Sequence, residues 1–240
     1  LQPRRPGGEV DFLITVNEDK STTVNIHEGT AKIRGRDGAL NTIGDEQSVT
    51  IDAAGENVEV STLSQAPQVT TPVDGDVIAY RNVPEQVEFR WNAVAGADRY
   101  HIVVARDPEF SDRVVDDDVV GTSFIHGALT PGAYYWHVRS RTGWSQSAQS
   151  AVRSIRVRQD LVPPLLELNP PPSAVEAGPW RLHGRTDSDA SVFIDDVLIQ
   201  HVEGRIDHPI ELNPGANFIV VEAFDSVGNL SYAPLLVTAK

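Results

Sequence analysis

The 240-residue sequence contains no cysteine and no methionine. Without cysteine the chain can form no disulfide, bind no metal through thiolates and use no cysteine nucleophile. The lack of methionine leads us to expect that a leader or a longer N-terminal part precedes residue 1. Apolar runs are short as well, and none approaches the roughly 18 residues of a membrane-spanning helix. We therefore expect no direct insertion of this segment into a membrane.

Positive charge is scarce. Twenty Lys and Arg residues against 34 Asp and Glu give a formal net charge of −14. The imbalance is −5 over residues 1–66 (6 basic, 11 acidic), −1 over 67–159 (10 and 11) and −8 over 160–240 (4 and 12). Nucleic acids and anionic membrane surfaces are both bound through clusters of basic residues. The composition therefore disfavours both as partners.

Catalytic motifs are missing too. The seven histidines are scattered, with no His-x-His or His-x-x-x-His pair for zinc. There is no Gly-x-Ser-x-Gly elbow and no phosphate-binding glycine loop. Paired carboxylates catalyse only when they are held about 5–10 Å apart across a cleft, and single sandwiches offer few clefts. We expect a protein that is not an enzyme, with no catalytic residue, no cofactor and no metal site.

The densest acidic run is Asp116, Asp117 and Asp118. Neighbouring residues of a strand point to opposite faces, so these three cannot all face one ion. A solvated strand edge that discourages pairing with another sheet is the favoured interpretation. Calcium stays a minority alternative, because the Asp-x-Asp-x-Asp-Gly loop is missing.

What the sequence does contain is short apolar alternations broken by Gly, Asn and Asp, which is a pattern of strands and turns. Proline-rich stretches at residues 66–72 and 162–172 read as module boundaries. We predict an all-β chain of three modules, in which a small β module precedes two tandem β-sandwiches. The predicted boundaries are 1–66, 67–159 and 160–240.

The alternation is clearest in residues 134–139. It places Tyr134, Trp136 and Val138 inward, and Tyr135, His137 and Arg139 outward. A short internal echo supports the repeat of the sandwich plan: Leu-Thr-Pro-Gly-Ala at 129–133 and Leu-Asn-Pro-Gly-Ala at 212–216 each precede a predicted strand.

Three resemblances cover nearly the whole chain. With Phe-Arg-Trp at 89–91, Asp-Pro-Glu-Phe at 107–110 and Gly-Ala-Tyr-Tyr-Trp at 132–136, the second module resembles bacterial fibronectin type III domains. The third module, with Ala-Phe-Asp-Ser-Val-Gly-Asn at 223–229, looks like a bacterial Ig-like domain. The first, with Val-Asn-Ile-His-Glu-Gly at 24–29 and Gly-Asp-Glu-Gln at 44–47, is similar to the C-terminal half of a FecR-type domain. These resemblances imply a periplasmic or cell-surface location.

The aromatic residues carry the best binding signal. Trp91 and Trp136 are expected in the core, whereas Trp144 lies in a polar turn, where it would either contact a partner or plug the end of the sandwich. We predict partner binding by Trp144 and by the outward row of Tyr135, His137 and Arg139, a row that could instead contact a neighbouring module or only face solvent. The expected function is a cell-envelope scaffold that binds protein. The alternatives are peptidoglycan or carbohydrate binding through exposed aromatics, and a periplasmic signalling ectodomain of FecR type.

Overall fold

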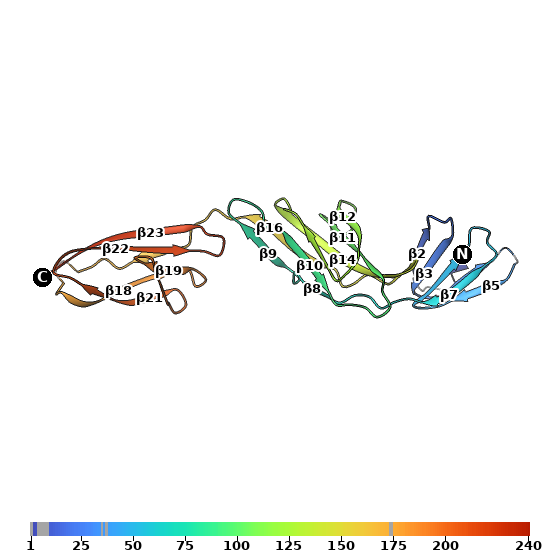
Figure 1. Ribbon diagram of the computed structural model, residues 1–240, viewed down its shortest axis with the longest axis horizontal. Helices are drawn as coiled ribbons and strands as arrows, with labels where there is room; N and C mark the ends of the chain where they lie inside the picture. The colour runs from blue at the N-terminus through green and yellow to red at the C-terminus, as the bar shows by residue number, and fades with distance from the viewer. Residues whose placement is uncertain (1, 4–9, 35, 37, 173–174) are drawn as a thin grey trace. The chain divides into compact units, whose positions relative to one another are not determined.

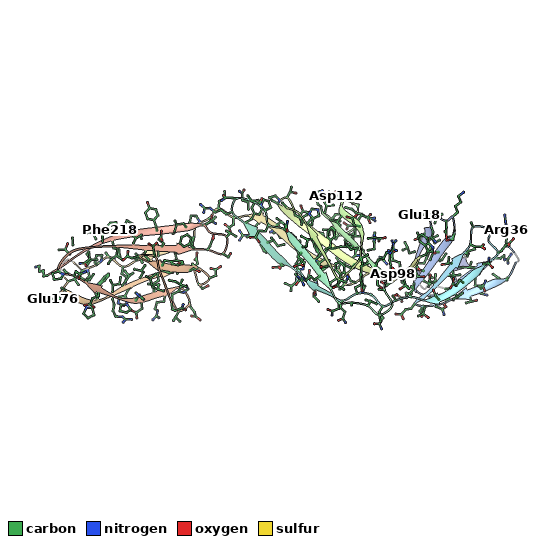
Figure 2. The ribbon with its side chains drawn as sticks, viewed as in Figure 1. Glu18, Arg36, Asp98, Asp112, Glu176 and Phe218 are labelled. Atoms are coloured by element: carbon green, nitrogen blue, oxygen red, sulfur yellow. The ribbon has the colours of Figure 1, made fainter. Side chains whose placement is uncertain are left out.

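The structure is a computed structural model that describes residues 2–3, 10–34, 36, 38–172 and 175–240. The chain divides into two compact units (Figure 1): unit 1 is Leu1–Ile78 with Glu85–Arg158, and unit 2 is Ala79–Pro84 with Gln159–Lys240. All regular structure in the described residues is β-strand, so they include no helix that could cross a membrane. Side chains fill the space between the sheets (Figure 2). The predicted all-β fold of tandem sandwich modules is confirmed.

The N-terminal part of unit 1 contains two small antiparallel sheets. One has the order β2-β3-β6-β7, and the other has the order β1-β4-β5. Their strands are β1 (Gln2–Pro3), β2 (Asp11–Val16), β3 (Thr22–Glu28), β4 (Ala31–Arg34), β5 (Leu40–Ile43), β6 (Gln47–Ile51) and β7 (Val58–Thr62). The apolar core consists of Val24, Ile26, Ala31, Ile33, Ile43 and Val49.

Two motifs of this part, Glu-Gly at 28–29 and Gly-Asp-Glu-Gln at 44–47, have a local structural role. Gly29 adopts a φ of +95°, which a residue with a Cβ rarely does. Its backbone N–H donates to Asp45 Oδ1 at 2.6 Å. The Gly44 N–H donates to Gln47 Oε1 at 2.8 Å. The motif residues thus fix the turns at the ends of β3 and β5.

The rest of unit 1 is a sandwich of a three-stranded sheet, β13-β10-β8, and a larger sheet, β12-β11-β14-β16-β9, in which β15 also pairs with β14. Its strands are β8 (Val69–Thr71), β9 (Asp76–Tyr80), β10 (Val87–Trp91), β11 (Arg99–Ala105), β12 (Arg113–Val119), β13 (Ser123–His126), β14 (Gly132–Thr142), β15 (Ser145–Gln146) and β16 (Arg153–Gln159). Trp91 and Trp136 are buried on opposing sheets, as predicted. The ring of Phe89 meets that of Trp136 edge-on at 5.0 Å, an arrangement that aromatic pairs favour.

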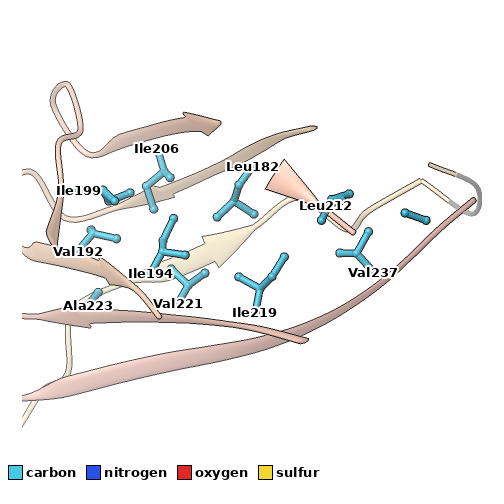
Figure 3. Close-up of a cluster of buried hydrophobic side chains, with 11 residues drawn as sticks. Leu182, Val192, Ile194, Ile199, Ile206, Leu212, Ile219, Val221, Ala223 and Val237 are labelled. Carbon is cyan, nitrogen blue, oxygen red and sulfur yellow. The ribbon is translucent and has the colours of Figure 1, made fainter. Parts of the chain in front are cut away.

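Most of unit 2 is a second sandwich, with sheets β17-β18-β21 and β20-β19-β22-β23. Its strands are β17 (Leu166–Leu168), β18 (Gly178–Thr186), β19 (Ser191–Ile194), β20 (Val197–Ile199), β21 (Arg205–Leu212), β22 (Gly215–Phe224) and β23 (Leu230–Ala239). Figure 3 shows the buried core, in which Leu182 and Ile206 of one sheet face Ile219 and Val221 of the other. Asp195 and Asp196 form a tight turn between β19 and β20, both with positive φ.

The sequence echo has the same structural place in both sandwiches. Leu129 and Leu212 are each at most 3% exposed. Three residues later, Gly132 and Gly215 begin the long strands β14 and β22. The repeated motif therefore anchors the start of the corresponding long strand in each module.

Candidate functional site

Strand β14 carries three of the four residues predicted to bind a partner. Its inward residues are almost fully buried, which confirms the predicted alternation. The outward residues differ in accessibility: His137 is buried at 6% exposure, whereas Tyr135 and Arg139 are half-buried. Trp144, in the turn after β14, is 48% exposed. Of the four predicted residues, Trp144 is the most accessible to a partner.

His137 is covered by the loop between β11 and β12. The Phe110 ring lies 4.6 Å from the imidazole in an edge-on arrangement. The Asp107 carboxylate shapes this loop, because it accepts hydrogen bonds from the Ser111 and Asp112 N–H groups at 3.0 and 2.6 Å. Burial lowers the pKa of His137 to about 4, and Arg139 adds to that effect. The ring is therefore neutral at pH 7 and lies beneath an aromatic cover.

A chain of charged side chains lies beside His137 on the same face. His101 Nε2 is 2.9 Å from Asp116 Oδ1, and His101 Nδ1 is 2.9 Å from Asp118 Oδ1. Arg113 and Arg141 pair with the same two carboxylates. These acids lie on β12, which is an edge strand of its sheet. This position agrees with the prediction that the acidic run forms a solvated strand edge. No group of three His, Cys, Asp or Glu in the described part of the chain could hold a metal ion.

Arg139 reaches across to the N-terminal part of unit 1. Its Nη1 donates to the Ser147 carbonyl at 3.0 Å and lies 3.4 Å from His27 Nε2 on β3. Its Nη2 donates to Gln149 Oε1 at 3.3 Å. Burial lowers the pKa of His27, and the nearby Arg139 charge lowers it further, while Asp11 opposes both. Arg139 is thus part of a contact between the first module and the fibronectin-like module.

The β14–β15 hairpin completes this contact, which we call the junction. Ser145 Oγ donates to Ser48 Oγ at 2.9 Å, and the Gln146 N–H donates to Asn25 Oδ1 at 3.5 Å. Ser140 Oγ donates to the Gln65 carbonyl at 2.8 Å. Asn25, Ser48 and Ser140 are fully buried. The junction is therefore a buried polar interface made from β3 and β6 on one side and β14 and β15 on the other.

The turn that carries Trp144 is held by hydrogen bonds. Gly143 adopts a φ of +56°, and its N–H donates to Asp98 Oδ2 at 2.9 Å. Thr142 Oγ1 donates to the Gly96 carbonyl at 3.0 Å. The exposed indole of Trp144 is therefore presented by a defined turn.

Two facing antiparallel sheets with a buried apolar core between them, repeated in two units, define tandem β-sandwich modules of fibronectin type III-like and Ig-like fold. No protein-family model matches the sequence, and no curated protein matches it either. The FecR-type resemblance of residues 1–66 therefore stays a prediction.

Solved structures share the fold at low sequence identity. The fibronectin(III)-like modules of Clostridium thermocellum CbhA are 14% identical, with a TM-score of 0.50 over 72% of this chain and 94% of that one. The chicken CNTN1 FN1–FN3 domains are also 14% identical and cover 96% and 98% of the two chains, with a TM-score of 0.45. The amphioxus IgVJ-C2 molecule is 16% identical over 67% and 99%, with a TM-score of 0.30. At these identities the likeness concerns the fold alone.

Sequence reasoning missed the cover over His137, and it gave contact of the Arg139 row with a neighbouring module only as an alternative. An aromatic residue in the Asp-Pro-Glu-Phe loop was the available signal for the cover, because an apolar ring in a polar loop packs on a neighbouring surface when one is in reach. For the junction, the signal was a strand with polar residues on one face and apolar residues on the other, namely Thr23, Asn25 and His27 against Val24 and Ile26.

Proposed function

We propose that the chain is a non-enzymatic binding and scaffold protein of the cell envelope, periplasmic or at the cell surface, whose β-sandwich modules present surfaces for protein–protein interaction. The junction within unit 1 carries the proposal. Hydrogen bonds are directional, and buried polar groups are costly when they lose their partners, so such an interface favours one arrangement of the two modules. A fixed arrangement is what a scaffold needs in order to hold its binding surfaces in register.

The envelope location is supported by the sequence resemblances of all three modules to bacterial envelope domains. The accessible Trp144 supplies an anchor of the kind that is enriched at protein interfaces, where one buried aromatic residue contributes much of the binding energy.

The test is made in cells of the source organism. Antibody detection after fractionation should find the protein in the periplasmic or envelope fraction. A photo-crosslinking amino acid at position 144 should give specific adducts that the same group at Val120, which is 86% exposed, does not give. Recovery only from the cytoplasm, or identical adducts at both positions, would argue against the proposal.

Carbohydrate or peptidoglycan binding is a second candidate, because Trp144 is exposed in a polar turn and indole rings stack on sugars. Pull-down on insoluble peptidoglycan should retain the chain and the Trp144→Phe variant, and should lose Trp144→Ala. Retention of Trp144→Ala at the level of the unmodified chain would remove this candidate.

A further inference from the structure

One face of the C-terminal sandwich is apolar although it points away from the core. Strands β22 and β23 pair so that their outward residues lie directly opposite one another. Three of the five outward pairs are wholly apolar, one joins Tyr232 to the one charged residue, Glu222, and one joins Ala216 to Thr238. The three apolar pairs are Phe218 with Leu236, Val220 with Pro234, and Phe224 with Leu230.

These residues do not belong to the core of the module. The inward residues of β22, Ile219, Val221 and Ala223, already fill the space between the sheets (Figure 3). Phe218 and Tyr232 are each 69% exposed and Leu236 is 64% exposed. Figure 2 shows Phe218 projecting away from the sheet. Strand β22 is therefore largely apolar on both faces, as is typical of a strand that is buried on both sides. The fold of this module covers only one of these faces.

The apolar face continues onto the next strands. Phe193 of β19 packs edge-on against Phe224 at 5.7 Å, and Leu198 of β20, 55% exposed, lies opposite Phe193. A large apolar side chain has a surface area of roughly 200 Å². Multiplied by the exposed fractions of these residues, this gives an exposed apolar patch on the order of 400 Å². A patch of this size is in the range of the largest apolar patch on a typical monomer, which is often a functional surface.

Acidic residues outnumber basic ones around this face, where Lys240 directly follows β23 and Arg81 Nη1 donates to the Gly228 carbonyl in the turn between β22 and β23. The four strands β19, β20, β22 and β23 contain no Lys or Arg, and Asp195, Asp196 and Asp225 lie in the turns at their ends. The arginines of the module lie on or beside the opposite sheet, where Arg181 pairs with Asp207 and Arg185 pairs with Glu167. The patch is thus an apolar surface with a mainly acidic rim.

We infer that the outward face of β19, β20, β22 and β23 docks a protein partner whose contact surface has an apolar centre and a rim of Lys or Arg. This inference rests on the proposed function and adds a surface and a partner chemistry to it. A second copy of the chain would bring two acidic rims together. An anionic membrane would be repelled by the same charges. Pro234 lacks an N–H group on edge strand β23, which disfavours docking by strand addition and favours docking on the face.

The test uses the full chain and a labelled 18-residue amphipathic helix of Leu and Lys as the probe, with the Leu/Glu peptide of the same pattern as its counterpart. Fluorescence anisotropy should show binding of the Lys peptide, and weaker binding at higher salt. The double variant Phe218→Ser, Leu236→Ser should bind about tenfold or more weakly, since two exposed anchors are lost. Glu222→Lys, a second variant on the same face, should also weaken binding.

The matched control is Val120→Ser with Val202→Ser, two residues that are 86% and 75% exposed and lie outside this face. It should bind the Lys peptide as the unmodified chain does. Equal binding of the Leu/Glu peptide, or equal losses in the control and test variants, would overturn the inference. So would binding of phosphatidylcholine vesicles through Phe218, or a dimer in sedimentation that Phe218→Ser dissociates. If the unmodified chain does not bind the Lys peptide but still crosslinks in the envelope through position 144, the docking face fails while the proposed function stands.

Discussion

Arg139 Nη1 lies 3.4 Å from His27 Nε2, although 112 positions separate the two residues in the sequence. A guanidinium can only donate hydrogen bonds, so the imidazole has to be neutral to accept one. A protonated ring would instead place two positive charges side by side within a half-buried contact. The junction therefore favours the unprotonated form of His27, in agreement with its lowered pKa.

We expect acid to weaken unit 1. The pKa of His137 falls from its usual 6.5 to about 4 through burial, and that of His27 is lowered by burial and by Arg139. Because the unfolded chain binds these protons more readily, the stability present above pH 6.5 is lost as the pH falls from 6.5 towards 4. For His137 the full loss is on the order of 3 kcal/mol. Urea unfolding followed by tryptophan fluorescence, in a Trp180→Phe background so that only unit 1 reports, measures it.

Carboxyl groups do not obscure this window. The lowered pKa values of Asp19, Asp52, Asp74 and Asp107 fall from 3.8, so their contributions are lost only at lower pH. The matched variant is His137→Gln, which cannot titrate and should show a clearly shallower loss between pH 6.5 and 4. The same acid profile with and without His137 would contradict the assignment.

We also expect Ser48 and Ser145 to be energetically coupled. Their hydroxyl groups form a hydrogen bond of 2.9 Å across the junction, and a buried hydrogen bond is worth about 1 kcal/mol. The free energies of unfolding of Ser48→Ala, Ser145→Ala and the double variant should give a coupling energy of about 0.5–1.5 kcal/mol. Ser48→Ala combined with Ser231→Ala in unit 2 should be additive. A coupling energy of zero for the first pair would mean that the junction does not form in solution.

The sequence predicts those features of the fold that depend on a single strand or turn. The period of two in residues 134–139 predicts which side chains enter the core, because successive residues of a strand point to opposite faces. Their inward set, Tyr134, Trp136 and Val138, is buried as predicted. The Asp195-Asp196 turn follows from equally local chemistry, since short polar residues tolerate positive φ.

Sequence is less informative where distant segments meet. The burial of His137 depends on a loop 27 positions away, and the junction joins residues 97 and 121 positions apart. No local pattern specifies such pairs. The run Phe-Ile-Val-Val at 218–221 is apolar at every position, so its pattern cannot tell which face stays exposed.

Truncation of Trp136 should lower the free energy of unfolding far more than truncation of Trp144. Trp136 is fully buried against Phe89, whereas Trp144 is 48% exposed. Trp136→Ala leaves a large cavity and should lower the free energy of unfolding by about 3–5 kcal/mol. Trp144→Ala should change it by no more than about 0.5 kcal/mol. Thermal unfolding of the two variants checks both values, and a destabilisation of several kcal/mol by Trp144→Ala would identify that side chain as a plug of the sandwich.

Gly204 is the glycine of unit 2 at which an added methyl group should lower the free energy of unfolding the most. It forms a two-residue turn with Glu203, with a φ of +78°, between the backbone partners Val202 and Arg205. Its carbonyl accepts a hydrogen bond from the Thr186 N–H at 2.8 Å, so the two backbones run close together. A Cβ at this position would overlap the carbonyl oxygen of Thr186. Backbone cannot move aside as a flexible side chain can, so Gly204→Ala should combine conformational strain with a steric clash.

Gly215→Ala separates the two effects. Gly215 also has a positive φ, +95°, but an added Cβ there meets no atom within 4 Å. It should cost only the strain of the backbone conformation, about 1 kcal/mol. Gly204→Ala should cost at least about 2 kcal/mol more than that, because a clash with backbone forces β18 and the turn apart. Chemical denaturation followed through Trp180 measures both variants, and equal destabilisation would show that the turn at Gly204 does not press against β18 as the structure has it.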